Sequence, residues 1–333
     1  MFAIVLVGGF GTRLRPLTEH VPKQMLPICG IPMIELVVGH LADHGVEKVG
    51  LAMGYRPDAF LEAYPNGYIA ETPYEVAVES EPLGTAGAIR FAVEQFQPKE
   101  TFLVLNGDVL TDLDVRALVE FHHEVQAEVT IALQPVDDPS SFGVVTTDTR
   151  GRVEAFIEKP EKGSVPSHNI NAGTYVLEPS AVEQIPQGRP VSVERETFPE
   201  LAASGTLYAL PSATYWLDTG TPQQFIQANL DMLNGKRKQV PHLPEAVIDP
   251  TSLITQSVIG SGSEVGVGAI IDKSVVLDRC QIGANSEVLG SILSEDVRVG
   301  QGARLDGCVI GQGQHIEPGE ILINQTRPEL NPT

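Results

Sequence analysis

The 333-residue chain is poor in cysteine, in positive charge and in long apolar runs. Its three cysteines lack the spacing of metal ligands or of a disulfide framework, which is typical of a reducing compartment. Only 22 Lys and Arg oppose 43 Asp and Glu, and this net charge of −21 disfavours a polyanion such as DNA as a partner. No segment approaches the roughly 18 consecutive apolar residues of a membrane span, and the apolar start has no basic leader. The composition predicts a soluble, cytoplasmic protein that binds neither nucleic acid nor membrane.

What is present begins with a short apolar strand that leads into a basic, glycine-rich loop. M-F-A-I-V-L-V occupies residues 1–7, and G-G-F-G-T-R-L-R-P-L-T follows at 8–18. Glycines at the carboxyl end of a strand let backbone N–H groups turn towards phosphate oxygens without obstruction by a Cβ. Arg13, Arg15 and Lys23 supply positive charge nearby. The spacing fits neither a Walker loop nor a dinucleotide fingerprint. The alternative interpretation is a tight turn that carries surface arginines.

Up to about residue 230, strand-like runs alternate with helical patterns, which predicts an α/β sheet flanked by helices. The strand-like runs include Lys48 to Met53, Phe102 to Leu105, Val129 to Leu133 and Thr174 to Leu177. The helical patterns include Met33 to His44 and Ala86 to Gln95. Residues 235–250 then contain three prolines and a glycine, which favours a linker.

A 17-residue repeat follows the predicted linker. One column of equivalent apolar positions is Ile254, Ile271, Val288 and Leu305. A second column is Val265, Ile282, Val299 and Ile316. A fixed period of this kind predicts coils of three short strands whose apolar side chains stack inward. A β-sandwich with evenly spaced strands is the alternative, although sandwiches do not keep a fixed period.

Two aspartates follow apolar, strand-like runs. Asp108 ends L-V-L-N-G-D, and Asp218 ends Y-W-L-D. A carboxylate at the carboxyl end of a strand faces the same crevice as the glycine loop, so Asp108 is placed to hold Mg²⁺. Taken alone, Asn-Gly-Asp is also a natural turn sequence.

Together these motifs resemble the sugar-1-phosphate nucleotidylyltransferases. The loop at 8–18 with P-K at 22–23 resembles the family signature. E-P-L-G-T-A-G at 81–87, F-I-E-K-P at 156–160 and N-I-N-A-G-T-Y at 169–175 resemble further motifs in the family's order. With the 17-residue coils, the likeness is greatest to GDP-mannose pyrophosphorylases. Gln24 departs from the pattern, because the family often has proline after the lysine.

The resemblance implies a Rossmann-like mixed-sheet catalytic domain at residues 1–234, a linker at 235–250 and a left-handed parallel β-helix at 251–325. It implies catalytic roles for Arg13 and Lys23, and a magnesium ion held by Asp108 and Asp218. The implied nucleotide-binding residues are Leu6, Gly8, Gly9, Gly11, Thr12, Glu79, Pro82, Gly84 and Thr85. The implied sugar-phosphate-binding residues are Gly143, Glu158, Lys159, Asn171 and Thr174.

In the implied reaction, an oxygen of a sugar 1-phosphate attacks the α-phosphorus of a nucleoside triphosphate and pyrophosphate leaves. The preferred pair is GTP and mannose 1-phosphate, because the Glu79 carboxylate can accept from the two adjacent donors of guanine. Two alternatives stay open: UTP or dTTP with glucose 1-phosphate, and a catalytically silent regulatory subunit. Short β-helices have open edges that proteins usually cover, so we expect a homo-oligomer.

Overall fold

The computed structural model describes residues 1–54, 57–161, 165–242 and 245–329, and the chain folds into two compact units. Unit 1 consists of Met1–Gly9 and Val37–Trp216. Unit 2 consists of Phe10–Leu36 and the chain from Leu217 onward. The glycine-rich loop is therefore divided, because Gly8 and Gly9 belong to unit 1 and Gly11 belongs to unit 2.

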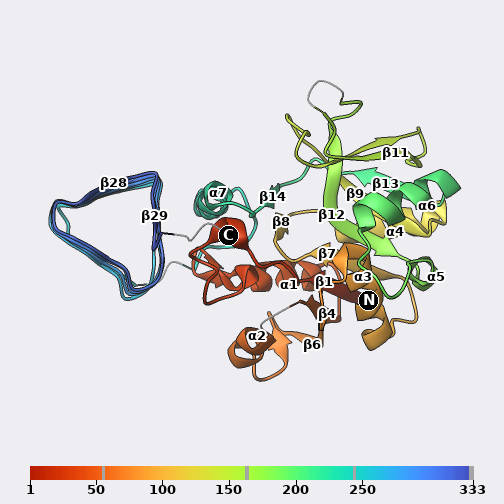
Figure 1. Ribbon diagram of the computed structural model, residues 1–333, viewed down its shortest axis with the longest axis horizontal. Helices are drawn as coiled ribbons and strands as arrows, with labels where there is room; N and C mark the ends of the chain where they lie inside the picture. The colour runs from red at the N-terminus through yellow and green to blue at the C-terminus, as the bar shows by residue number, and fades with distance from the viewer. Residues whose placement is uncertain (55–56, 162–164, 243–244, 330–333) are drawn as a thin grey trace. The chain divides into compact units, whose positions relative to one another are not determined.

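Unit 1 is built on a ten-stranded mixed sheet (Figure 1). Its parallel part has the order β7 (Phe102–Asn106), β1 (Phe2–Leu6), β4 (Lys48–Met53) and β6 (Thr72–Val78). The short β5 (Tyr68–Ile69) pairs antiparallel with β6. Both faces of β1 are buried, as its unbroken apolar run predicts for a parallel strand covered on both sides.

The other half of the sheet is largely antiparallel. β12 (Asn169–Leu177) pairs antiparallel with β7, with β9 (Val129–Pro135) and with β10 (Gly143–Thr147). β11 (Val153–Glu158) continues the sheet beyond β10, and β13 (Leu207–Pro211) runs parallel to β9. The four strands predicted from apolar runs all exist, and the longer observed β9 and β12 begin or end beyond those runs.

The remaining elements of unit 1 pack against this sheet or connect its strands. The elements are α2 (Pro57–Ala63), α3 (Gly84–Phe96), β8 (Val109–Thr111), α4 (Val115–Val125), α5 (Pro179–Glu183), a π-helix η3 (Val193–Thr197) and α6 (Phe198–Ser204). The helix α1 (Met33–Asp43) and the strand β14 (Trp216–Asp218) each have residues in both units. Fully buried side chains such as Phe102, Ile131 and Tyr175 form the core between the sheet and its helices.

Unit 2 begins with short elements and a helix. Two 3₁₀ turns, η1 (Thr12–Leu14) and η2 (Lys23–Met25), precede the two-residue strands β2 (Pro27–Ile28) and β3 (Ile31–Pro32). The helix α7 (Pro222–Leu233) starts at an N-cap, Thr221, whose hydroxyl accepts from the Gln224 N–H at 3.3 Å. Proline at the first helical position suits this start, because its missing N–H has no partner to lose there.

The C-terminal coils form three five-stranded parallel sheets, drawn as the three sides of a triangle in Figure 1. The first sheet contains β15 (Val247–Ile248), β18 (Glu264–Val265), β21 (Gln281–Ile282), β24 (Arg298–Val299) and β27 (His315–Ile316). The second contains β16 (Leu253–Thr255), β19 (Ile270–Asp272), β22 (Glu287–Leu289), β25 (Arg304–Asp306) and β28 (Ile321–Ile323). The third contains β17 (Val258–Ile259), β20 (Val275–Val276), β23 (Ile292–Leu293), β26 (Val309–Ile310) and β29 (Thr326–Arg327).

Register confirms the 17-residue repeat. Ile254 pairs with Ile271 and Val265 pairs with Ile282 in adjacent coils. Ile271, Val288 and Leu305 are fully buried inside the coils, as the inward apolar column requires. These parallel sheets fit the predicted left-handed β-helix.

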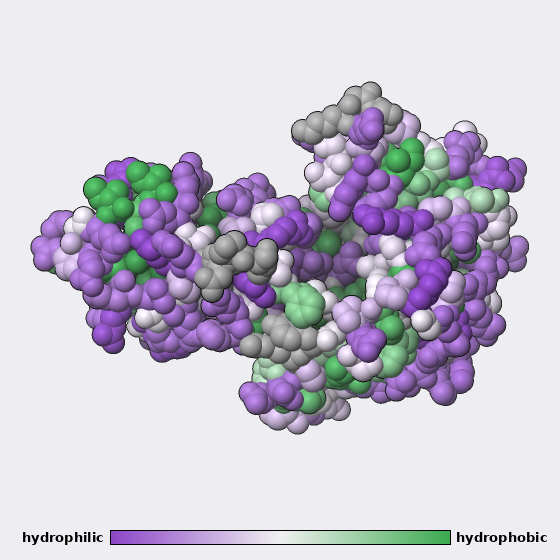
Figure 2. All heavy atoms as spheres, viewed as in Figure 1, coloured by the Kyte–Doolittle hydropathy of each residue, from purple (hydrophilic) through white to green (hydrophobic). Residues whose placement is uncertain are grey.

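The outer faces of the coils differ in their exposure. In the third sheet both residues of a strand are buried, as Val275 and Val276 show, because residues of the 10–36 segment and α7 cover this face within unit 2. The second sheet instead exposes Leu253, Ile321 and Ile323. Figure 2 shows hydrophobic atoms gathered over β28.

Among the described residues, no helix has both the length and the apolar character needed to cross a membrane.

The inward column yields a test of the β-helix core. We predict that Leu305→Ala lowers the free energy of unfolding by about 2–5 kcal/mol, because it leaves a cavity among buried side chains. Ile321→Ala is the matched control, since Ile321 is 63% exposed and its loss costs less than about 0.5 kcal/mol. Urea denaturation followed by circular dichroism measures both values. Equal losses in the two variants would contradict the assigned inward face.

Candidate functional site

The four parallel strands of unit 1 end at one edge of the sheet. Gly8 and Gly9 follow β1 there, Glu79 follows β6, and Asp108 lies two residues beyond β7. In open α/β sheets, ligands bind in the crevice outside this edge. Parallel pairing thus brings the glycines of the loop, the segment 79–87 that is predicted to recognise the base, and the predicted metal ligand Asp108 to the same edge.

Backbone hydrogen bonds continue beyond the strand ends and hold these exits in place. The Gly107 N–H donates to the Leu6 carbonyl at 2.9 Å, and the Glu79 N–H donates to the Met53 carbonyl at 2.8 Å. Gly8 and Gly9 are exposed, and a Cβ on Gly9 would meet no described atom within 4 Å. The side of Gly9 that a Cβ would occupy is therefore open, so a ligand can approach the main chain closely there.

Glu79 closes the turn at the start of the base-recognition segment, residues 79–87. Its carboxylate Oε2 accepts from the Leu83 N–H at 3.0 Å, and Glu79 is 8% exposed. Burial raises the pKa of Glu79, and the bond from the Leu83 N–H opposes that shift. One carboxylate oxygen of Glu79 thus shapes the main chain, a role that the sequence did not predict. Pro82 is exposed on the same turn.

Gly84 lies directly against a second segment of the chain. It has a φ of +73°, and a Cβ there would lie 2.6 Å from the Val191 carbonyl oxygen. The Val191 N–H donates to the Leu83 carbonyl at 2.8 Å, and the Val191 carbonyl accepts from the Ala86 N–H at 3.0 Å. Only glycine permits this approach, so the main chain requires glycine at position 84 whether or not a base is bound.

The Thr85 side chain is turned towards η3. Its hydroxyl donates to Glu194 Oε2 at 2.8 Å and accepts from the Val193 N–H at 2.8 Å. The residues V-E-R-E at 193–196 also resemble a segment of the family, but the contact of Glu194 with Thr85 was not predicted from the sequence. A π-helix often marks a functional position, but the 109 residues between Thr85 and Glu194 hide the contact from sequence patterns.

The sugar-phosphate residues of unit 1 gather on β10, β11 and the start of β12. Gly143 is paired with Glu158 across the strands, and a Cβ on Gly143 would lie 3.0 Å from Glu158 Oε2. Burial raises the pKa of Glu158, and the neighbouring Glu194 carboxylate raises it further, whereas Lys159 and Arg195 lower it. Lys159 Nζ lies 3.8 Å from Glu158 Oε1 and is largely exposed.

Asn171 and Thr174 are more deeply placed. The Asn171 amide donates to the Tyr175 hydroxyl at 2.9 Å and accepts from the Gly173 N–H at 3.0 Å. Thr174 is buried and is paired with Leu105 of β7. The Asn171 amide therefore has internal partners, and its contact with a sugar stays a prediction.

The negative charges of three carboxylates act on the buried Tyr175. Burial raises the pKa of Tyr175, and the charges of Glu194, Glu158 and Asp108 raise it further. In the described part of the chain, no three His, Cys, Asp or Glu side chains are close enough to form a metal site by themselves. Mg²⁺ is often held by one or two carboxylates plus substrate phosphates, so this finding is compatible with the predicted role of Asp108.

Unit 2 brings two cations and a carboxylate together. Lys23 Nζ lies 3.7 Å from Asp218 Oδ1, and the Lys23 side chain is 5% exposed. The Arg13 guanidinium lies over Gly220, where an added Cβ would be 2.6 Å from Nη2. The adjacent Gln24 is also buried, and its Oε1 has no hydrogen-bond partner in the described structure.

The glycine loop leads directly into the turn that contains Arg13. Gly11 has a φ of +60°, and its carbonyl accepts from the Thr18 hydroxyl at 2.9 Å. Thr12 then begins η1, which contains Arg13. Since Asp108 belongs to unit 1 and Asp218 to unit 2, a metal shared by the two aspartates stays a prediction.

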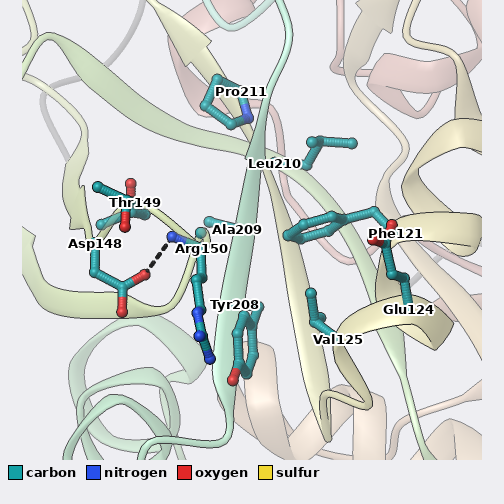
Figure 3. A pocket seen from close by; sticks show the side chains of 12 residues that line it. Phe121, Glu124, Val125, Asp148, Thr149, Arg150, Tyr208, Ala209, Leu210 and Pro211 are labelled. Carbon is teal, nitrogen blue, oxygen red and sulfur yellow. Dashed lines mark hydrogen bonds between the residues drawn. The ribbon is translucent and has the colours of Figure 1, made fainter.

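A groove of about 740 Å³ on unit 1 contains none of these residues (Figure 3). It is lined by the end of α4, the β10–β11 turn and β13. The Asp148 carboxylate closes that turn by accepting from the Arg150 N–H and the Arg152 N–H, each at 2.9 Å. The Asp148 carboxylate therefore stabilises the β10–β11 hairpin.

Comparison with known proteins gives a consistent result across the chain. Residues 2–235 match the family model described as "Nucleotidyl transferase", and residues 237–327 match the "GMPPB C-terminal domain". The mannose-1-phosphate guanylyltransferase of Mycobacterium tuberculosis is 40% identical, over 85% of this chain and 81% of that protein. Mannose-1-phosphate guanylyltransferase 1 of Arabidopsis thaliana is 36% identical, over 97% and 94%.

A solved structure is similar to about two thirds of the chain. HddC from Yersinia pseudotuberculosis matches with a TM-score of 0.59 and 29% identity, covering 68% of this chain and 97% of that one. A second structure of HddC is complexed with GMP-PN and matches equally well.

Gly84 offers a test with a matched control. Gly84→Ala and Gly188→Ala place a side chain at φ values of +73° and +75°, but a Cβ on Gly188 would meet no described atom within 4 Å. Each substitution costs about 1–2 kcal/mol of backbone strain. We predict that only Gly84→Ala also displaces the base-recognition segment, and weakens nucleoside triphosphate binding by about tenfold or more, which calorimetry measures. Equal binding of the nucleoside triphosphate by both variants would contradict the proposed role of this contact.

Proposed function

The chain belongs to the nucleotidyl transferase family, and from this premise we propose that it transfers the guanylyl group of GTP to mannose 1-phosphate, giving GDP-mannose and pyrophosphate. The observation that carries the proposal is the 36% identity to a plant mannose-1-phosphate guanylyltransferase, which extends over 97% of this chain. The gathering of Glu79, Gly84, Glu158 and Asp108 on unit 1 supports it further.

We propose that the two anionic substrates are held by backbone amides and by a small number of cations. The amides of Gly8, Gly9 and Gly11 and the Arg13 guanidinium bind the triphosphate and stabilise the leaving pyrophosphate. Lys23 contacts the α-phosphate, and Lys159 holds the sugar phosphate. These cations stand out in a chain of net charge −21, so the site is locally basic within an acidic protein.

The chemistry requires positioning more than proton transfer. The attacking phosphate oxygen is already ionised, so no general base is needed. Holding the two substrates in line supplies much of the barrier reduction, and fixed positive charge stabilises the transferring phosphoryl group. The side chains around the edge of unit 1 fit this scheme, since they are acceptors for hydroxyl and base donors beside exposed amides.

Nucleotidyltransferases of this kind generally use a divalent metal. We propose Mg²⁺ as that metal, with Asp108 and Asp218 as its protein ligands. Carboxylate oxygens are the hard donors that Mg²⁺ prefers, and both aspartates follow strands. When bound, the ion would bridge substrate phosphates and neutralise part of their charge.

Two alternatives are less well supported. A catalytically silent subunit has no need of Arg13, Lys23, Asp108 and Asp218, all of which are present. UTP or dTTP with glucose 1-phosphate requires the same machinery, and only the base and sugar contacts distinguish it. Relatives named for mannose 1-phosphate favour the guanylyl reaction.

We also propose a homo-oligomer that uses the coils and binds neither nucleic acid nor membrane. The second sheet of the β-helix exposes Leu253 and Ile270 at one edge and Ile321 and Ile323 at the other, and association would remove this apolar surface from water.

Two substitutions test the catalytic assignment. We expect Lys23→Ala and Asp108→Ala to lower kcat by about 10²–10³, because each removes a preorganised charge from the phosphate site. Lys48→Ala is the control, since Lys48 is an exposed residue paired with Glu75. Pyrophosphate release measures the rate, and EDTA should abolish it until Mg²⁺ is restored. Near-normal turnover in either active-site variant would refute the assignment.

The nucleotide preference is tested separately. We expect kcat/KM to be highest for GTP among GTP, UTP, dTTP and ATP, and Glu79→Gln to reduce that preference by about five- to 150-fold. The amide oxygen that Glu79→Gln introduces can still accept from the Leu83 N–H, so the substitution removes charge and keeps the turn. Glu81→Gln is the exposed control. A preference for UTP or dTTP in the wild type rejects the guanine assignment, whereas an unchanged GTP preference in Glu79→Gln rejects only the residue.

A further inference from the structure

We propose that Glu194 is a positioning residue that joins the base-recognition segment, residues 79–87, to the sugar-recognising carboxylate Glu158. It would hold Thr85 by a hydrogen bond and place its own negative charge beside Glu158. This inference rests on the proposed function for its substrates, although the contacts themselves do not depend on it.

The first support is a closed set of hydrogen bonds around one carboxylate oxygen. Glu194 Oε2 accepts from the Thr85 hydroxyl and from the Ser192 hydroxyl, each at 2.8 Å. The Thr85 hydroxyl in turn accepts from the Val193 N–H at 2.8 Å. Thr85 is therefore held through both its donor and its acceptor, which fixes its rotamer. Bonds to a charged acceptor are the stronger ones in proteins.

The second support is the backbone next to these bonds. The Val191 carbonyl accepts from the N–H groups of Ala86 and Gly87, and the Val191 N–H donates to the Leu83 carbonyl. Since Gly84 lies between these bonds with its Cα against Val191, any shift of residues 191–194 moves the base-recognition segment with it. Glu194 stabilises this contact at the N-terminal end of α3.

The third support is the position of Glu194 relative to the sugar side. The Glu194 charge raises the pKa of Glu158, while Lys159 and Arg195 act in the opposite direction. These four charged groups come from β11, the residue that follows it, and η3, which packs against β11. In the described structure, no residue donates a hydrogen bond to Glu194 Oε1. Glu194 thus contacts the base side through Oε2 and acts on Glu158 through its charge.

Three substitutions separate these effects. Glu194→Gln removes the charge, while its amide oxygen can still accept from Thr85 and Ser192. Glu194→Ala removes both the charge and the bonds. Thr85→Val removes both hydrogen bonds of the Thr85 hydroxyl, the one to Glu194 and the one from the Val193 N–H, and leaves the Glu194 charge. Glu200→Ala is the matched control, because Glu200 is an exposed carboxylate on the nearby α6.

The first readout is amide hydrogen exchange of the full chain without substrates, which does not depend on activity. We expect Glu194→Ala to speed exchange at Ala86 and Val193 by about tenfold or more, and Glu194→Gln and Glu200→Ala to leave it within about twofold. Unchanged exchange in Glu194→Ala would overturn the proposal, even if the protein proved to use other substrates. A wild type that transfers no nucleotide would instead reject the proposed function and leave this readout to decide on Glu194.

The second readout is steady-state kinetics with GTP and mannose 1-phosphate. We expect Glu194→Ala and Thr85→Val each to raise KM for GTP about tenfold with kcat within about threefold, and their double variant to show no further increase. Glu194→Gln should keep KM for GTP and move the acid limb of kcat/KM for mannose 1-phosphate to lower pH, because Glu158 then ionises more easily. Additive effects in the double variant, or an unmoved acid limb in Glu194→Gln, would overturn the proposal.

Discussion

Parallel pairing of β1 with β4 and β7 is the constraint on which the site of unit 1 depends. Because parallel strands point the same way, every strand exit that carries a functional residue opens at one edge. The antiparallel β12 then returns along β7, so its first residues begin at that edge instead of ending there. Nucleotide and sugar motifs from distant parts of the chain therefore meet without any long connecting loop.

Close backbone approaches set the shape of this edge. Gly84 against Val191 and Gly173 against Asn106 both need positive φ and leave no room for a Cβ. These contacts position neighbouring side chains, since Thr85 follows Gly84 and Asn171 accepts from the Gly173 N–H. The glycines of the motifs thus act first on the chain itself, and their value for a ligand follows from the conformations they allow.

Periodic features could be predicted from the sequence, whereas contacts between distant side chains could not. The 17-residue columns require inward stacking whatever lies around them, so the pairing of Ile254 with Ile271 follows from the period alone. The run Lys48 to Met53 is an unbroken apolar strand, and its observed bounds are the same. The contact of Glu194 with Thr85 was missed because nothing near Glu194 in the chain reports on Thr85. The bond from the Leu83 N–H to Glu79 was also missed, since an acidic residue before a turn reads equally well as a ligand group or as a turn acceptor. The predicted roles of Asp108 and Asp218 rest on motif alone, because they belong to separate units.

Their negative charge explains why the acidic side chains of this site need hydrogen-bond donors and cations beside them. We propose Glu79 and Glu158 as acceptors for the donors of a base and a sugar, yet burial and the neighbouring Glu194 charge raise the pKa of Glu158. A carboxylate that becomes protonated presents a donor in place of an acceptor, so it no longer complements the donors of a base or a sugar. The bond from the Leu83 N–H to Glu79 opposes the rise in the pKa of Glu79, and Lys159 and Arg195 oppose the rise in the pKa of Glu158. Lys23 in unit 2 shows the converse case, because a cation that is 5% exposed is stabilised by the Asp218 carboxylate. Lys23, which we propose to contact the α-phosphate, is therefore held by Asp218 without a bound phosphate, and a charge fixed in advance stabilises a transferring phosphoryl group with little reorganisation.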